Sequence, residues 1–268
     1  MKAGLRIWIE MIGELFQHRE LIWRLIVRDI SAKYKQSFFG IFWLFLTPLV
    51  MMFVFVWIKS KNILPIDESI MPYPAFVFIG QMIWLIFSQG LIYSANCMIA
   101  AGDMLTKINF PREVLLFSAI GQTVFEFIFR IPLLIIVFLF VDFSPSVMCL
   151  FAPLAIIPLL FLVMGLGFFV SILNAVTRDT GNMIGIIVTL GVFATPVIYP
   201  PPKTWPLSFL INTINPVSGY INCVRDLTLN GSLTDIQGYF FSVIFSMLIF
   251  LIGWRIFHLV EPKIAERV

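Results

Sequence analysis

Charged residues are scarce in this chain. Its 268 residues include 18 Lys and Arg and 15 Asp and Glu, which together make up only 12%, whereas a soluble domain has about 25%. Hydrophobic residues make up 60%, and they include 29 Phe and 7 Trp. One soluble core cannot bury so many apolar side chains, so lipid must surround most of them. The composition therefore excludes an ordinary soluble globular protein.

The residues that most metal and catalytic sites need are also few. Only two His, His18 and His258, are present, and Cys97, Cys149 and Cys223 form no C-x-x-C pair, so we expect no metal site. Free buried thiols are expected, with a Cys149–Cys223 disulfide as the alternative. No Gly is followed by Lys, which excludes a P-loop, and no G-x-G-x-x-G, H-E-x-x-H or G-x-S-x-G motif occurs. We expect neither enzymatic activity nor a cofactor bound by this chain.

Positive charge is concentrated near the N-terminus. The formal net charge is only +3, which is too small a surplus to indicate a nucleic-acid partner. Lys and Arg are enriched in cytoplasmic segments of membrane proteins, so the start of the chain is expected to be cytoplasmic. The first 36 residues hold 7 of the 18 basic residues: Lys2, Arg6, Arg19, Arg24, Arg28, Lys33 and Lys35.

Six segments are apolar and long enough to cross a bilayer, which takes about 20 helical residues. They lack the alternating pattern of a membrane barrel, so they are predicted to be helices of an all-α membrane protein. Six crossings bring the C-terminus back to the cytoplasm, with a membrane unit at 37–260 and a tail at 261–268. The predicted spans are 39–58, 74–94, 114–141, 147–173, 183–200 and 239–257.

The segment 1–36 is amphipathic. Leu5, Trp8, Ile9, Ile12 and Phe16 recur at helical spacing, while charged residues occupy the other faces. This pattern is typical of a helix that lies in the membrane interface and binds membrane lipids. Two interpretations remain open: a basic anchor on anionic lipid, or a docking surface for a cytoplasmic partner.

The predicted connection at 201–237 is unusually apolar for a loop. It follows Pro200, breaks at Asn215-Pro216, and contains apolar pieces that are each too short to span a bilayer. Such pieces indicate a re-entrant helix pair before the last span. A pair of helices lying on the outer surface is the alternative.

The third predicted span carries a polar stripe. Gln122, Glu126 and Arg130 follow one another at intervals of four residues, so they share a helix face. Charges inside a membrane are costly and are candidates for function. Glu126 and Arg130 can neutralise each other. The pair either locks helix packing or lines a passage.

Two motifs are similar to those of a known family. The segments 28–43, with Thr47-Pro48-Leu49 after it, and 103–115 resemble the membrane subunits of type-2 ABC exporters for polysaccharides and polyol phosphates. Weaker matches lie at 174–179, at 195–199, and at Asn215-Pro216 with Arg225. The matches occur in the family's order along the chain.

The resemblance implies a permease half that pairs with a second copy of itself. Each copy would bind a separate cytoplasmic ATPase subunit, and ATP and Mg would be bound there. The connection 97–113 would contact that subunit, with a short helix over 97–110 ended by Pro111. The implied coupling residues are Arg28, Lys33, Leu105, Lys107, Phe110, Pro111, Arg112, Glu113, Arg178 and Asp179.

The resemblance also implies the cargo class and the membrane. We expect export of a lipid-linked glycan such as an O-antigen across a bacterial inner membrane. A teichoic-acid exporter or an exporter of drugs or small lipids is the alternative within the family. An ion-coupled transporter would need internal repeats and several buried carboxylates. Candidates for lining the substrate pathway are Glu126 and Arg130 and the aromatic residues Trp84, Tyr93, Tyr199, Trp205 and Tyr220. For the aromatic residues, a belt at the membrane interface is the alternative.

Overall fold

The computed structural model describes residues 2–35, 38–61, 71–102, 104–108, 110–177, 179–200 and 214–264. Within these ranges every regular element is a helix, which confirms the predicted all-α fold. Five helical stretches there are long and apolar enough to cross a membrane, so this is a multi-pass membrane protein. They are α3 (Phe42–Ser60), α4 (Tyr73–Ala101), α6 (Glu113–Phe140), η1 (Val147–Phe151) continued by α7 (Ala152–Val176), and α10 (Ile236–Ile264).

The predicted fifth span, 183–200, has the wrong boundaries. The helix there, α8 (Asp179–Ala194), has 16 residues and ends before Thr195. Pro196 explains this end, because a proline lacks the backbone donor and disfavours the α conformation at the residue before it. Since α8 is shorter than a typical span, the count of six spans stays a prediction.

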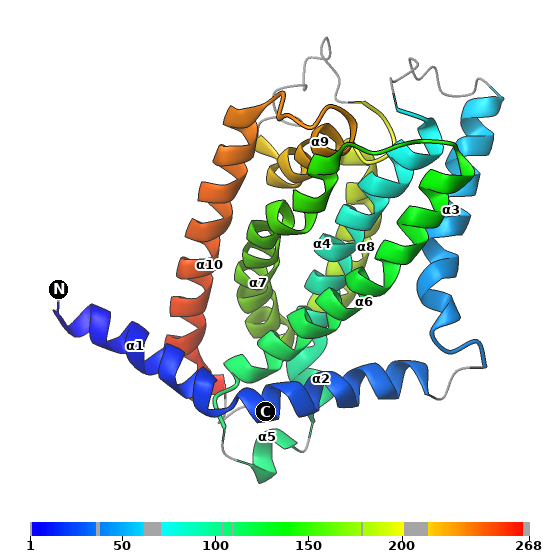
Figure 1. Ribbon diagram of the computed structural model, residues 1–268. Coiled ribbons are helices and arrows are strands. Elements are labelled where there is room, and N and C mark those ends of the chain that lie inside the picture. Colours follow the sequence, from blue (N-terminus) through cyan, green and yellow to red (C-terminus); the bar gives the residue numbers. More distant parts are fainter. Residues whose placement is uncertain are drawn as a thin grey trace.

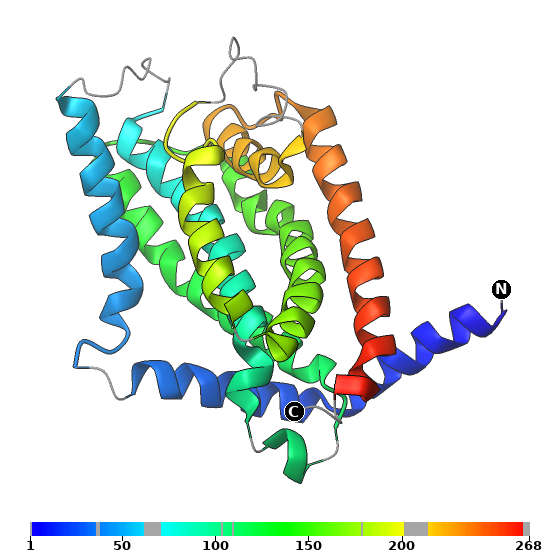
Figure 2. The ribbon, with the colours of Figure 1, turned by 180° about the vertical axis from the view of Figure 1, so that it is seen from behind.

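Helix α4 is longer than predicted. It continues past residue 94 to Ala101, although Ser94 and Asn96 interrupt the apolar run. Ser94 and Ala95 are fully buried, and Ser94 lies against Gly167 of α7. Most of α4 is buried in this way, because α3, α6, α7, α8 and α9 (Pro216–Leu229) all pack around it (Figures 1 and 2). Protein rather than lipid surrounds Ser94, whereas Asn96 is exposed near the end of the helix.

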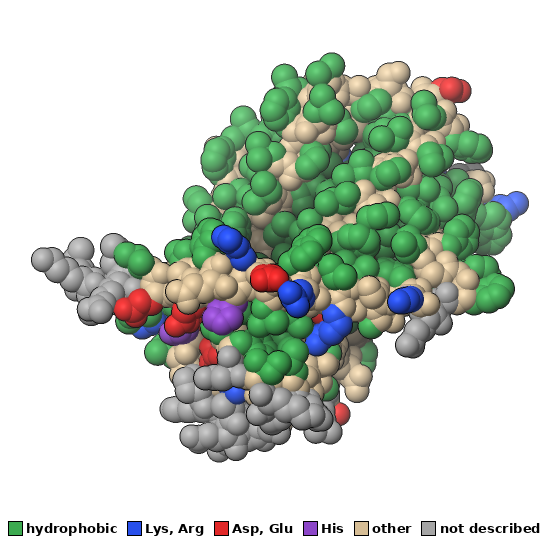
Figure 3. Space-filling model, turned by 60° about the horizontal axis from the view of Figure 1, so that its bottom comes forward, with side chains coloured by type: hydrophobic (Ala, Val, Ile, Leu, Met, Phe, Trp, Pro, Cys, Tyr) green, Lys and Arg blue, Asp and Glu red, His purple; other side chains and the backbone are tan. Residues whose placement is uncertain are grey.

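The amphipathic segment forms two helices, α1 (Lys2–Gln17) and α2 (Arg19–Tyr34). They lie across one end of the bundle, roughly perpendicular to the spans (Figure 1). Charged and His side chains gather in a band at this end, while hydrophobic side chains cover the spans beside it (Figure 3). Helix α2 packs against α6. Its side chain Leu25 is buried.

The connection after α4 differs from the predicted helix over 97–110. Helix α4 ends at Ala101, and Gly102 has a φ of +47°, a conformation that favours glycine. Of the residues described between Gly102 and Pro111, the four of α5 (Met104–Lys107) are helical. Phe110 precedes Pro111 and lies outside any helix.

Helix α9 lies at the opposite end of the bundle from α2 (Figures 1 and 2). Asn215 caps it by accepting a hydrogen bond from the backbone N–H of Val217. The preceding part of the predicted re-entrant pair, 201–213, lies outside the described residues. The re-entrant pair therefore stays a prediction, with α9 as one short helix. All three cysteines are free thiols, as expected, but only Cys223 is buried, while Cys97 and Cys149 are half-buried.

Candidate functional site

Glu126 is the centre of a polar cluster that joins three helices. Its carboxylate, on α6, is only 1% exposed. Oε1 accepts hydrogen bonds from Lys33 Nζ at 2.7 Å and Tyr34 OH at 2.9 Å, both on α2, and from Tyr93 OH of α4 at 2.6 Å. Oε2 accepts one from Arg130 NH2 at 2.9 Å. We call these five residues the Glu126 cluster.

The local sequence explains how α2 reaches this carboxylate. Lys33 and Tyr34 are the last residues of α2, where the helix lies against α6 and α4. Lys33 also donates to Tyr93 OH, and its side chain is 40% exposed. Tyr34 is buried. Burial and the neighbouring Glu126 raise the pKa of the Tyr34 hydroxyl above its usual value, so at neutral pH it stays protonated and able to donate.

The cluster contains one anion between two cations. The predicted pairing of Glu126 with Arg130 is confirmed, and the Arg130 side chain is 5% exposed. Arg130 Nε and NH1 have no hydrogen-bond partner among the described residues. Because four donors occupy the carboxylate, it is not available as a general base. The geometry is that of a fastening point between α2 and the spans α4 and α6.

Two further contacts join α2 to α6 and to α5. Arg28 pairs with Asp29 at 2.7 Å, and its NH1 lies 3.7 Å from the sulfur of Met104 in α5. Ser118 of α6 donates to the Asp29 carboxylate at 3.3 Å. The predicted coupling residues Arg28 and Lys33 both lie on α2. Arg28 contacts α5, and Lys33, near the end of α2, belongs to the Glu126 cluster.

The start of α6 is joined to the end of α10. Arg112 donates twice to Glu261: its backbone N–H to Oε1 at 2.7 Å, and NH1 to the backbone carbonyl at 2.9 Å. Glu113 Oε1 accepts from Trp254 Nε1 at 3.3 Å and lies 2.9 Å from His258 Nδ1. Arg112 and Glu113, predicted as coupling residues, thus have partners within this chain.

The side chains of Glu113, His258 and Glu261 are of types that can bind a metal ion, and their potential ligand atoms lie within 4.8 Å of one another. Glu113 Oε1 and Glu261 Oε1, however, are already engaged by His258 and by the Arg112 backbone. Arg112 supplies a positive charge at the same place. We therefore describe this group as a hydrogen-bonded junction between α6 and α10.

The other predicted coupling residues have varied surroundings. Phe110 is buried within this chain, Leu105 is half-buried, and Asp179 begins α8 with its side chain exposed. Pro111 separates Phe110 from the junction. The side chain of Lys107 and all of Arg178 lie outside the described residues.

The predicted pathway aromatics do not line one common wall. Trp84 is buried and lines a cavity of about 300 Å³ between α4, α7, α8 and the start of α9. Tyr220 is fully buried, where its hydroxyl contacts Ser242 and Ser246 of α10. Tyr199 donates to the Phe193 carbonyl at 2.9 Å. Tyr93 belongs to the Glu126 cluster, and Trp205 lies outside the described residues.

Arg225 of α9 forms a contact that the sequence analysis did not assign. It is 6% exposed, and its guanidinium donates to the carbonyls of Phe76, Pro196 and Val197. The guanidinium carbon lies 3.4 Å from the centroid of the Phe76 ring. The signal that could have found this role is a lone Arg within a short apolar helix, since a buried charge needs several partners.

The comparisons with known proteins agree with this architecture. The ABC-2 type transporter family model matches residues 20–229. An O-antigen export system permease protein RfbA of Myxococcus xanthus is 30% identical over 192 residues, which cover 72% of this chain and 73% of the relative. An RfbA of Klebsiella pneumoniae is 27% identical over 264 residues, 95% of this chain and 96% of the relative. Family members are transport permeases rather than enzymes, and they imply an ATP-binding partner subunit. The chain belongs to the ABC-2 type transporter family.

Proposed function

We propose that this chain is the permease subunit of an ATP-driven exporter that moves a lipid-linked polysaccharide of the O-antigen class across a bacterial inner membrane. The relatives carry the name of O-antigen export permeases over most of both chains. The absence of a Gly-Lys pair from the sequence is consistent with ATP hydrolysis on a separate subunit.

The observation that carries the mechanism is the attachment of α2. A separate ATPase can act on the spans only through elements at the face of the bundle where it binds. Helix α2 lies across one end of the bundle (Figure 1) and contacts Met104 of α5 through Arg28. The Glu126 cluster fixes the end of the same helix to α4 and α6. A movement of α2 and α5 caused by the ATPase would therefore be transmitted directly to α4 and α6.

The assembly belongs to the same proposal. Two copies around a twofold axis would enclose a route that one bundle lacks. The basic N-terminal segment supports a cytoplasmic location for α1 and α2. In this arrangement α8 is the sixth span, and α9 is part of a re-entrant pair on the outer side. Both chain ends are then cytoplasmic.

Surface display of the glycan tests this function. A bacterial strain that assembles a lipid-linked O-antigen but lacks its permease would be supplied with this chain and an ATP-binding partner subunit. We expect antibody against the glycan to label intact cells when both subunits are present. Full-length glycan retained inside the cells, with both subunits present in the membrane as a complex, would contradict the proposed cargo.

A matched pair of variants in α2 tests the coupling step in the same cells. Lys33→Met removes a donor from the Glu126 cluster and should lower surface labelling at unchanged protein abundance. Arg24→Met removes an exposed pair with Glu20 on the same helix and should leave labelling unchanged. Equal labelling by both variants would remove α2 fastening from the mechanism and leave the cargo assignment intact.

A further inference from the structure

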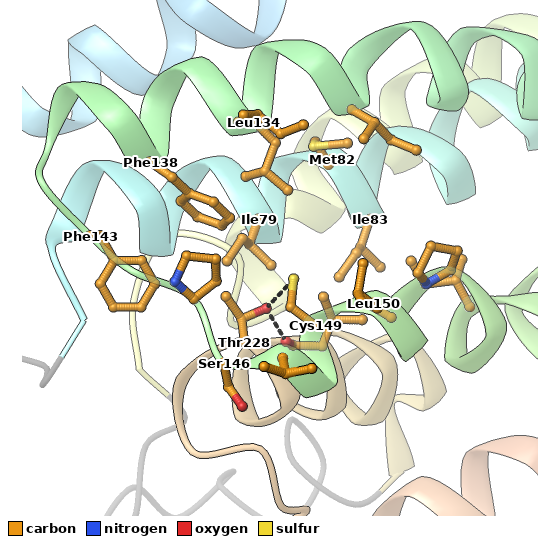
Figure 4. A pocket seen from close by; sticks show the side chains of 18 of the residues that line it. Ile79, Met82, Ile83, Leu134, Phe138, Phe143, Ser146, Cys149, Leu150 and Thr228 are labelled. Carbon is orange, nitrogen blue, oxygen red and sulfur yellow. Dashed lines mark hydrogen bonds between the residues drawn. The ribbon is translucent and has the colours of Figure 1, made fainter.

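A second cavity, of about 570 Å³, lies away from the Glu126 cluster, between α4, α6, α9 and the η1–α7 stretch. Figure 4 shows it from close by. Its floor is formed by buried side chains of α4 and α9, among them Ile79, Ile83 and Val224. None of these residues belongs to the proposed coupling path.

The mouth of this cavity faces the lipid. Its rim includes Ile135 and Leu139 of α6 and Val147 and Leu150 of η1, whose side chains are 53%, 73%, 77% and 80% exposed. These residues are on helices that are long and apolar enough to cross the membrane, so acyl chains contact them. The cavity is therefore continuous with the lipid-facing surface rather than with water.

The polar groups inside the cavity, on Ser146, Cys149 and Thr228, have partners within the chain, and Ser144 lies exposed at its outer end. Thr228 Oγ1 donates to the Val224 carbonyl at 2.7 Å and lies 3.6 Å from Cys149 Sγ (Figure 4). The backbone N–H of Ser146 donates to the Thr228 carbonyl at 2.9 Å. A cavity lined by apolar side chains with its polar atoms satisfied does not hold water. Its chemistry suits a hydrocarbon chain.

The polar groups are also at one end. Ser144 and Ser146 lie in the connection after α6 ends at Phe140, where the span leaves the hydrocarbon region. The floor residues Ile79 and Ile83 lie deeper along α4. A chain that enters at this rim can therefore keep its polar headgroup at the interface while its tail lies in the cavity.

We propose that this cavity binds one acyl chain of a membrane glycerophospholipid. An empty cavity would leave its walls without contact atoms on one side, and filling it restores that dispersion energy. The surrounding bilayer is as apolar as the cavity, so the gain comes from packing rather than from exclusion of water.

Photochemical labelling tests the site. The full chain in lipid nanodiscs would be irradiated with a glycerophospholipid that carries a diazirine near the middle of one acyl chain, and adducts would be mapped by mass spectrometry. We expect adducts on Ile79, Ile83 or Val224, which bulk lipid does not reach. Adducts confined to exposed residues such as Leu139 and Leu150 would overturn the proposal.

A filled cavity provides the control. Ile83→Trp should lower adducts at Val224 by about fivefold, which corresponds to about 1 kcal/mol, while Ile186→Trp on the exposed face of α8 should leave them unchanged. If Ile83→Trp does not fold, the folded protein is treated instead with a small alkyl thiosulfonate at Cys149, in a variant with Cys97 and Cys223 replaced by Ala. Unchanged floor labelling after that block, or floor labelling by an isoprenyl phosphate probe but not by the phospholipid, would contradict the assignment.

Discussion

Glu126 shows most clearly how single residues hold this molecule together. It is one buried carboxylate with two cationic and two phenolic donors. Glu126→Gln would leave Arg130 buried without its anion, while Lys33 can turn to water. Breaking a buried pair in this way costs about 3–5 kcal/mol. We therefore expect a large fall in thermal stability, measured by unfolding of the purified chain in nanodiscs.

The exposed pair Arg24–Glu20 is the matched control for Glu126→Gln. Its side chains are 74% and 75% exposed and it has the same i, i+4 spacing as Glu126 and Arg130. Arg24→Met should change stability by less than about 1 kcal/mol. Comparable losses in both variants would mean that burial of the Glu126 cluster is not what stabilises it.

A double variant tests whether the polar stripe does more than lock helix packing. Glu126→Gln with Arg130→Met removes both charges, so no buried charge is left unpaired and much of the folding should be recovered. If the charges only lock packing, the folded double variant also recovers export. We expect export to stay low, because Lys33 of α2 loses its ionic partner on the span. Wild-type export would leave the structural interpretation alone.

Arg225 carries a separate prediction about stability. Arg225→Met would leave the carbonyls of Pro196 and Val197 without this donor, whereas the Phe76 carbonyl keeps its helical hydrogen bond within α4. At about 1 kcal/mol or more for each of the two orphaned carbonyls, the variant should lose at least about 2 kcal/mol. Arg225→Lys should recover part of this loss because an ammonium also donates, but without the fork of a guanidinium. Unfolding midpoints equal to wild type in both variants would show that this contact contributes nothing.

Residue spacing predicts some of these contacts and not others. The Glu126–Arg130 pair follows from the helix period, because residues four apart share a face. Lys33 and Tyr34 are more than 90 residues from Glu126 along the chain. Local spacing therefore cannot predict that they contact Glu126. The same holds for Arg112 with Glu261, which meet only because α10 ends where α6 begins.

At the scale of helices, close packing of α7 and α10 depends on glycine. A Cβ on Gly165 would lie 2.6 Å from the backbone nitrogen of Phe250, and one on Gly253 would lie 2.4 Å from the Gly165 carbonyl oxygen. Backbone atoms cannot turn aside, so Gly165→Ala must push the helices apart. We expect it to lower the unfolding temperature and the yield of folded protein.

Gly185 of α8 supplies the control for this helix crossing. A Cβ there meets nothing within 4 Å, so Gly185→Ala should be neutral, or stabilising by up to about 1 kcal/mol through helix propensity. If Gly165→Ala were as well tolerated as Gly185→Ala, the close approach of α7 and α10 would not be required.

Hydropathy predicts the existence of the helices better than their ends. The predicted helices near 39–58 and 114–141 agree with α3 and α6 to within a few residues. For α4 the prediction stopped at Ser94, which is in fact covered by α7, since hydropathy cannot distinguish a lipid neighbour from a protein neighbour. For α8 it ran through Thr195-Pro196, where the backbone chemistry of proline decides the end. The predicted helix 97–110 was wrong because Gly102 adopts a positive φ that ends α4.

At the scale of the whole molecule, the structure is polar at one end. The band of charged side chains along α1 and α2 lies at one end of the bundle, and α9 lies at the other (Figures 1 and 3). This asymmetry agrees with the concentration of basic residues in the first 36 positions. Under the proposed function, this end is the face on which the ATP-binding subunit would bind.

Directed movement of the cargo is the central claim, and proteoliposomes test it most directly. The chain and its ATP-binding subunit would be reconstituted with a lipid-linked O-antigen, and glycan crossing the bilayer would be measured as it becomes protected from a membrane-impermeant glycosidase. The account predicts ATP-dependent protection with both subunits, and neither ATP hydrolysis nor protection with this chain alone. ATP hydrolysis by the chain alone, or no protection by a complex whose ATPase is active, would contradict it.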